Sequence, residues 1–212
     1  MPETVDLAAL LCSRLCHDML SPVGALSNGI ELLRDERDPE MRERCMELLE
    51  QSARISADKL KFFRLAYGAA GGFGDVVPTE EPRALVQGLV GDNGRIALHW
   101  AVGAPQLPKP AVKVLLNLAA IGIDALPRGG QLDVGAEVRD GATEIAVRAA
   151  GAKIAFDNSI GMALDGSLDL EDLSGRTAPA HMIRLIAERS GGGLQYALNE
   201  EALVMGAVLP DA

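Results

Sequence analysis

One histidine of this chain has the surroundings of a reactive group. His17 lies in the segment HDMLSPVGAL, directly before Asp18 and five residues before Pro22. An exposed imidazole offers a nucleophilic ring nitrogen near neutral pH, and a neighbouring carboxylate can orient the ring or move a proton. Pro22 interrupts the backbone hydrogen bonds one turn later, which would bend a helix near the histidine. The pattern predicts a nucleophilic His17 with Asp18 as its orienting or proton-transferring neighbour.

The residues around His17 predict a long helix that points this side chain away from the core. Apolar residues recur at three- and four-residue steps from Leu7 to Leu33 and form a stripe on one helix face. If Leu7 is set at zero, the stripe averages about 90° around the helix axis and His17 falls at about 280°. Small or polar side chains within about 40° of His17 form a strip that we expect to dock a partner, and we call it the docking strip. Its residues are Arg14, Ser21, Gly24 and Asn28.

Three cysteines offer a different chemistry for the same region. Cys12 and Cys16 are four residues apart on the predicted helix, and with His17 and Cys45 they could in principle hold a metal ion. However, Cys12 falls within the apolar stripe and Cys45 on the apolar seam of the next helix, so both are expected to be small core residues. An odd number of cysteines without framework spacing also favours reduced thiols. We expect no metal site here.

A second long helix follows, and the two helices are expected to need a second chain. Asp38 supplies an N-cap, Pro39 a first-turn proline and Glu40 a first-turn acid, and the helix is predicted to run to Tyr67. Its apolar seam reads Met41, Cys45, Leu48, Ser52, Ile55, Lys59, Phe62 and Ala66. A hairpin covers only one face of each helix, so we expect two chains to form a dimeric four-helix bundle. The Gly-rich stretch GAAGGFGD at 68–75 is predicted to be a flexible link.

The rest of the chain alternates short strands and helices, which predicts an α/β sandwich and an α+β class for the whole. We place the domains at 1–70 and 71–212. The predicted strands are Ile96–Val102, Gln131–Val138 and Thr143–Ala149, the helices are Lys109–Leu126 and Thr177–Ser190, and a hairpin of Gly193–Leu198 and Ala202–Leu209 closes the chain.

The other two histidines are given no functional role. His99 is predicted to be packed or on an edge strand, and His181 is predicted to be structural or on the surface. The acidic run at 165–173 is predicted to be a solvated loop, because it lacks the ligand spacing of a calcium loop.

Composition and charge exclude several classes of protein. Hydrophobic residues make up 48% and charged residues 24% of the 212 residues, as in ordinary globular proteins. The net charge of -10 opposes binding to nucleic acid and to anionic membranes, which are bound through Lys and Arg. Apolar runs stay below the roughly 18 residues that span a bilayer, and the acidic N-terminus is unlike a secretory signal. We therefore expect a cytoplasmic protein.

Several motifs together resemble two-component histidine kinases. HDMLSP, in the first of two long helices, resembles their phosphoacceptor box. LLNLAAIGIDALPRGGQLDV resembles the asparagine-box helix and following strand of their ATP-binding domain, and VRAAGAKIAF its first glycine box. The C-terminal segment HMIRLIAERSGGGLQYALNEEALVMGAVLP resembles the last helix and hairpin of that domain. This resemblance implies that the sandwich is a histidine-kinase-like ATPase domain of the Bergerat type.

The residues that would bind ATP in such a domain are largely replaced. Asn117 stands at the first asparagine of its box, but the second, a magnesium ligand in the kinases, is Ile121. The adenine-binding aspartate is replaced by Ala149, the second glycine of the glycine box is Lys153, and only Gly151 remains there. The glycine-rich box over the phosphates is not recognisable between residues 167 and 181. The resemblance therefore implies a degenerate domain that binds ATP weakly or not at all, and we expect no bound cofactor.

The helical hairpin and the degenerate domain together resemble the ChpT-type histidine phosphotransferases of alphaproteobacterial phosphorelays. The segment HDMLSPVGALSNGIELL resembles this family more specifically than it resembles kinases in general. The resemblance implies a homodimer in which the outer ring nitrogen of His17 accepts a phosphoryl group. The donor would be a receiver domain of a hybrid histidine kinase, and downstream response regulators would take the group. Mg²⁺ would be bound by the receiver and no cofactor by this chain. The alternative is a docking module or inhibitor of a kinase or response regulator, in which His17 is inert.

Overall fold

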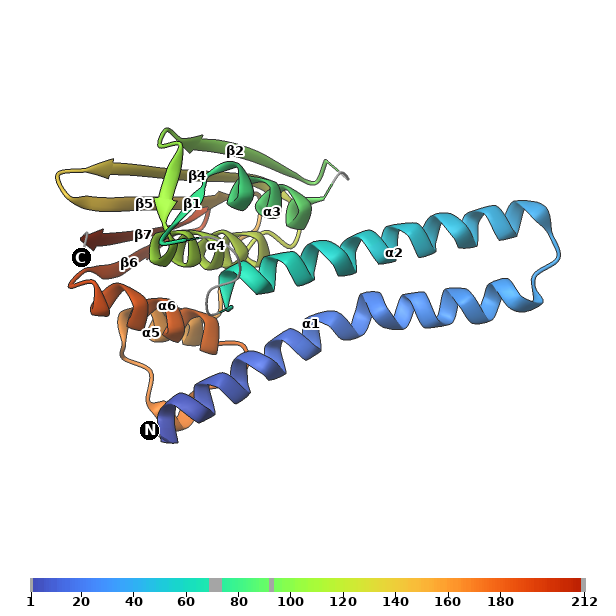
Figure 1. Ribbon diagram of the computed structural model, residues 1–212, viewed down its shortest axis with the longest axis horizontal. Helices are drawn as coiled ribbons and strands as arrows, with labels where there is room; N and C mark the ends of the chain where they lie inside the picture. Colours follow the sequence, from blue (N-terminus) through green and yellow to red (C-terminus); the bar gives the residue numbers. More distant parts are fainter. Residues whose placement is uncertain (1, 69–73, 92–93, 211–212) are drawn as a thin grey trace.

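The chain folds into a long helical hairpin and an α/β sandwich, so the predicted α+β class is confirmed (Figure 1). The structure, a computed structural model, describes residues 2–68, 74–91 and 94–210. Most of the predicted link at 68–75, namely residues 69–73, lies outside the described residues. Figure 1 shows the hairpin projecting away from the sheet as an arm, while its base lies against the helices that cover the sheet.

The hairpin consists of α1 (Pro2–Asp35) and α2 (Pro39–Ala66), and both predicted helices are confirmed. The Asp38 side chain accepts a hydrogen bond of 3.0 Å from the backbone N–H of Glu40, which caps α2 as expected. Gly29 lets the two helices approach closely, since a Cβ there would lie 2.7 Å from the side chain of Leu49. A side chain at position 29 would therefore require Leu49 to shift.

A single chain buries only part of the predicted seam of α2. Cys45 and Phe62 are buried, whereas Met41, Leu48 and Ile55, which follow one another at seven-residue steps, are 43%, 61% and 40% exposed. On α1, Val23 and Ile30 are exposed at the same spacing. Seven-residue apolar rows are typical of helices that pack against further helices. The dimeric four-helix bundle stays a prediction, and these rows are where a second chain would pack.

Cys12 corrects one detail of the sequence analysis. It was expected to be a core residue, but it is exposed in the single chain, and only Cys45 is buried. The reason is geometric: α2 covers only one side of the broad apolar stripe of α1, and Cys12 lies on its flank.

The sandwich is built on a five-stranded mixed sheet. Its order is β2 (Ile96–Val102), β4 (Gly130–Arg139), β5 (Ala142–Ala150), β7 (Ala202–Pro210) and β6 (Gly193–Leu198). β2 and β4 are parallel and the other neighbours antiparallel. The helices α4 (Lys109–Asp124) and α6 (Ala178–Arg189) pack against one face of this sheet (Figure 1). All predicted strands and helices of this part are confirmed within one or two residues at each end.

Four short elements were not predicted. They are β1 (Val76–Pro78) and β3 (Gln106–Pro108), which pair with each other, and the helices α3 (Glu80–Val90) and α5 (Asn158–Asp165). Pro82 and Gly88 within α3, and Gly161 within α5, are helix-disfavouring residues that obscured the pattern. The acidic run is a loop with a single 3-10 turn at Leu170–Asp172. His99 lies on the edge strand β2, while His181 is buried in α6.

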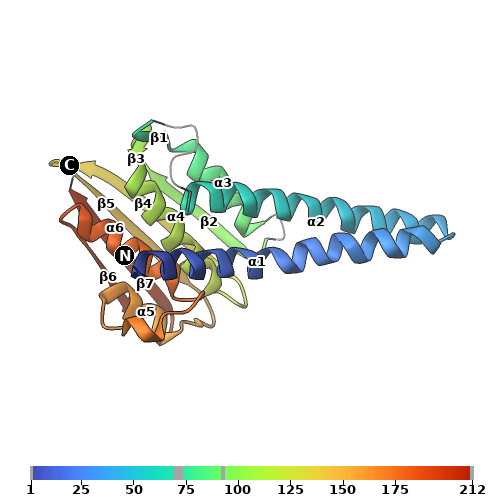
Figure 2. The same cartoon turned by 60° about the horizontal axis from the view of Figure 1, so that its bottom comes forward.

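The core joins the hairpin to the sandwich. Leu115, Leu116 and Leu118 of α4 are fully buried, and Phe62 and Phe63 from the end of α2 belong to the same apolar cluster as these leucines and the sheet residues. The N-terminal part of α1 contacts α6, as the second view shows (Figure 2). This packing holds the middle of α1, including His17, beside the C-terminal end of α4.

Candidate functional site

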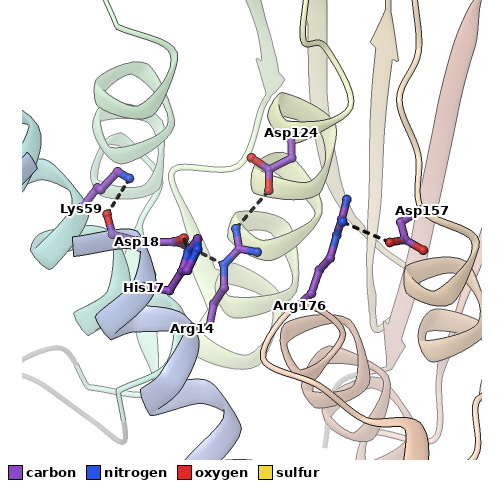
Figure 3. Close-up of polar contacts among 7 residues, drawn as sticks. All are labelled: Arg14, His17, Asp18, Lys59, Asp124, Asp157 and Arg176. Carbon is purple, nitrogen blue, oxygen red and sulfur yellow. Dashed lines mark hydrogen bonds and ion pairs between the residues drawn. The ribbon is translucent and has the colours of Figure 1, made fainter. Parts of the chain in front are cut away.

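His17 presents one ring nitrogen to a carboxylate. Its side chain is 82% exposed, and Nδ1 lies 3.2 Å from Oδ1 of Asp18 (Figure 3). A carboxylate oxygen at this position favours the tautomer that carries its proton on Nδ1. The lone pair is then on Nε2, the outer nitrogen. This is the arrangement that a nucleophilic imidazole requires.

Asp18 is itself held in place by Arg14, which joins the helix to the sandwich. Arg14 Nε donates to Oδ2 of Asp18 at 2.7 Å, and its Nη2 lies 3.1 Å from Oδ2 of Asp124 at the end of α4 (Figure 3). Burial disfavours the charged guanidinium, but the carboxylates of Asp18 and Asp124 outweigh this and raise the pKa of Arg14. The two oxygens of Asp18 thus serve different partners, one the imidazole and one the guanidinium.

Lys59 completes the support of the backbone at the site. Pro22 has no N–H, so the carbonyl oxygen of Asp18, four residues earlier, lacks its helical donor. Lys59 Nζ of α2 donates to that oxygen at 3.0 Å, and α1 continues without a break (Figure 3). The sequence analysis placed Lys59 on the seam but missed this role. The available signal was the carbonyl four residues before a proline, which needs a donor from elsewhere.

Tyr67 is a second residue that the sequence analysis missed here. It is the C-cap of α2 and stacks on Phe63 with ring centroids 5.4 Å apart. Burial raises the pKa of Tyr67 to about 12, an effect that Asp18 and Asp124 strengthen and Arg14 opposes. Nothing in the local sequence signals this environment, because it arises where α1, α2 and α4 meet.

A cavity of about 500 Å³ opens beside His17 between α1 and the sandwich. Six residues line it: Ser13, Arg14, His17, Asp124, Gly175 and Arg176. Arg176 precedes α6, and its Nη1 lies 3.2 Å from Oδ2 of Asp157, the N-cap of α5. The sequence analysis assigned nothing to this loop. The fold therefore brings a second arginine to the cavity from a segment about 160 residues further along the chain.

The remaining residues of the docking strip lie further along α1. Ser21 and Asn28 are exposed and Gly24 is half-buried, as expected for a contact surface. Arg14 differs from them, because its side chain is only 25% exposed and pairs with two carboxylates. The partner contacts of the docking strip stay a prediction.

The alternative metal site does not assemble. Cys45 is buried, whereas Cys12 and Cys16 are exposed. Among the residues that the structure describes, no group of three or more His, Cys, Asp or Glu side chains could hold a metal ion.

Most side chains at the positions of the kinase-like boxes are buried. Asn117 is buried, and its Nδ2 donates to the backbone oxygen of Lys113, one turn earlier in α4, at 2.8 Å. Ile121 and Ala149 are buried apolar residues, and Lys153 is exposed. The one retained asparagine is thus satisfied within its own helix.

Comparison with known proteins identifies the family. Residues 79–202 match the histidine phosphotransferase C-terminal domain. The chain belongs to the histidine phosphotransferase family. It is 34% identical over 205 residues to the protein phosphotransferase ChpT of Brucella abortus (strain 2308), covering 97% of this chain and 96% of that protein. It also matches a bacterial phosphotransferase solved at 1.7 Å, with 32% identity, a TM-score of 0.83 and 96% of both chains covered.

These matches confirm the ChpT-type resemblance inferred from HDMLSPVGALSNGIELL and the degenerate boxes. They span both the hairpin and the sandwich, so the two parts belong together in this histidine phosphotransferase. In the described ranges, none of the helices is both long and apolar enough to cross a membrane.

Proposed function

We propose that this histidine phosphotransferase relays a phosphoryl group through His17 between the aspartates of receiver domains. The donor is the receiver of a hybrid histidine kinase, and the acceptors are downstream response regulators. The observation that carries the proposal is the imidazole itself, which is 82% exposed with Nδ1 held by Asp18 and Nε2 outward. A receiver could bring its aspartyl phosphate to that nitrogen without moving the chain.

The transfer is a balanced exchange of one bond for another. The lone pair of His17 Nε2 attacks phosphorus, the P–O bond to the receiver aspartate breaks, and the carboxylate leaves with the bonding electrons. The imidazole becomes a phosphoimidazolium whose Nδ1–H still donates to Asp18, and that contact stabilises the new positive charge. The reverse sequence on a second receiver returns the group to an aspartate and restores neutral His17.

The receiver is expected to supply the metal ion and this chain none. Mg²⁺ bound by the receiver would neutralise the phosphoryl oxygens, while this chain contributes a positioned nucleophile. Phosphorylation of His17 directly from ATP is not part of the proposal. Two observations support this: Asn117 is hydrogen-bonded within its own helix, and Ile121 and Ala149 have no side-chain donors or acceptors.

We further propose that the protein acts as a homodimer in the cytoplasm. The exposed seven-residue rows on both hairpin helices support a bundle made by two chains, because such rows are costly to leave in water. A dimer would present two His17 residues on the outside of one bundle.

The test uses a ³²P-labelled receiver domain from a hybrid histidine kinase as donor. We expect label on the wild type and none on His17→Ala. His99→Ala is the matched control, because His99 is also exposed and lies 3.6 Å from the carboxylate of Asp133. Equal labelling of wild type and His17→Ala would refute the relay and leave an inert docking module. Labelling of His17 from [γ-³²P]ATP and Mg²⁺ alone would refute the proposal that His17 is not phosphorylated directly from ATP.

A further inference from the structure

The cavity beside His17 contains two guanidinium groups in different states. Arg14 is 25% exposed and is paired with two carboxylates, at 2.7 and 3.1 Å. Arg176 is 61% exposed and has one ion pair, from Nη1 to Asp157 at 3.2 Å. Guanidinium carries five N–H donors, so most of those on Arg176 remain for another acceptor. Figure 3 shows Arg176 between Arg14 and Asp157, on the side of His17 that faces the sandwich.

The loop that carries Arg176 is held against the phosphoacceptor helix. Ser174 and Thr177 bond to each other, with the N–H of Ser174 donating to the Thr177 hydroxyl at 2.9 Å. Gly175 lies directly on α1, where a Cβ would come within 3.4 Å of the Leu10 oxygen and 3.5 Å of the Arg14 nitrogen. The loop is therefore anchored at Gly175, about one turn before His17, and its next residue, Arg176, lines the cavity. A Cβ at 175 would thus be in van der Waals contact with the backbone of α1, which shows how closely the loop lies on the helix.

The charge of Arg176 becomes important when His17 carries a phosphoryl group. A phosphoryl group on Nε2 adds about two negative charges beside Asp18 and Asp124, whose carboxylates repel it. Arg14 is already neutralised by those two residues. Arg176 is the other cation that lines the cavity, and guanidinium is suited to bind phosphoryl oxygens in pairs.

From this geometry we propose that Arg176 binds the phosphorylated state: its guanidinium contacts the phosphoryl group on His17, sharing or giving up Asp157. The inference rests on the proposed function, since it requires a phosphoryl group at His17. It assigns to the sandwich a part in stabilising the intermediate, in addition to any contact with receivers. The contact also opposes rotation of the phosphoimidazole away from the incoming aspartate.

The first readout needs no receiver. The protein is phosphorylated with potassium phosphoramidate, and the ³¹P chemical shift of the phosphohistidine is followed as a function of pH. A guanidinium contact stabilises the dianion, so the titration midpoint of the wild type is expected about 0.5–1 pH unit below that of Arg176→Ala. Arg176→Lys keeps the charge and should fall between the two.

Arg139→Ala is the matched control, because Arg139 is 68% exposed and has one ion pair, with Asp140 at 3.3 Å, on the β4–β5 turn. It should titrate like the wild type. Identical midpoints for wild type, Arg176→Ala and Arg139→Ala would overturn the inference while leaving the relay intact. Weaker binding of unphosphorylated receiver to Arg176→Ala with an unchanged midpoint would likewise overturn it and make Arg176 a docking residue. Absence of label on His17, from phosphoramidate and from a receiver alike, would instead refute the proposed function.

Discussion

The hydrogen bond from Lys59 to the Asp18 carbonyl predicts an energetic coupling between α2 and Pro22. Lys59 Nζ donates at 3.0 Å to an oxygen that has no helical donor because residue 22 is proline. Lys59→Met keeps most of the apolar stem of the side chain and removes only the charged donor. Losing a hydrogen bond from a charged group costs about 1.5–3 kcal/mol, and because the site is half-buried we expect about 1–2 kcal/mol less stability.

Pro22→Ala supplies the missing donor. The backbone N–H of residue 22 would then bond to the Asp18 carbonyl, so the same Lys59→Met change should cost only about 0.5 kcal/mol or less. The double-mutant cycle is therefore expected to give a coupling energy of about 1 kcal/mol, above the scatter of independent sites. Pro22→Ala alone should be stabilising, since a proline inside a helix costs about 3 kcal/mol and loss of the buried ring offsets only part of this.

The assay is urea unfolding followed by circular dichroism at one fixed protein concentration, because association changes apparent stability. Lys61→Met is the control: Lys61 is two residues away, 61% exposed and paired only with Asp58 at 3.4 Å. It should change stability by at most about 0.5 kcal/mol in either background. Equal costs of Lys59→Met with Pro22 and with Ala at position 22 would show that the bond does not replace the missing helical donor.

Three further predictions follow from the site and the hairpin. The pKa of Tyr67 is raised to about 12 from its ordinary 10, so the protonated phenol stabilises the fold fully below pH 10, and this stabilisation is lost as pH rises through 12. Over this range the free energy of unfolding of the wild type should fall by about 2–3 kcal/mol more than that of Tyr67→Phe. Parallel curves of stability against pH for the two proteins would contradict this. Asp18→Ala removes the acceptor that fixes the Nδ1–H tautomer and should slow phosphoryl transfer about tenfold or more in quenched-flow experiments, while receiver binding by calorimetry is unchanged. Unaltered transfer would show that Asp18 does not orient the ring. Leu48→Glu puts a charge in the exposed seven-residue row and should convert dimer to monomer in light scattering, whereas a monomeric wild type would refute the bundle.

The helices of the hairpin could be predicted closely because their signals are local. Asp38 and Pro39 start α2 through a cap and a fixed backbone angle, and the apolar steps between Leu7 and Leu33 repeat over many turns. The same reasoning missed α3 and α5, since a proline or glycine within so short a helix outweighs its apolar pattern. In these helices tertiary packing overrides local propensity.

At the site, contacts between residues of one helix could be predicted from the sequence, but contacts between α1 and the sandwich could not. Angular positions on one helix placed His17 outward and beside Asp18, and the geometry agrees. They could not show that Arg14 turns toward Asp124, or that Arg176 reaches the same cavity, because these contacts depend on how α1 rests against the sandwich. Cys12 was wrongly predicted to be buried for a related reason: an apolar stripe on a helix does not determine which edge of the stripe the partner helix covers.

The relay through His17 is tested most directly by a two-step transfer. The protein is labelled from a ³²P-phosphorylated receiver, freed of that receiver, and offered to a second, unlabelled receiver with Mg²⁺. Wild type and His99→Ala are expected to pass the label to the second receiver, while His17→Ala neither accepts nor passes it. Label that reaches the second receiver through His17→Ala, or that remains on the wild type, would contradict the account.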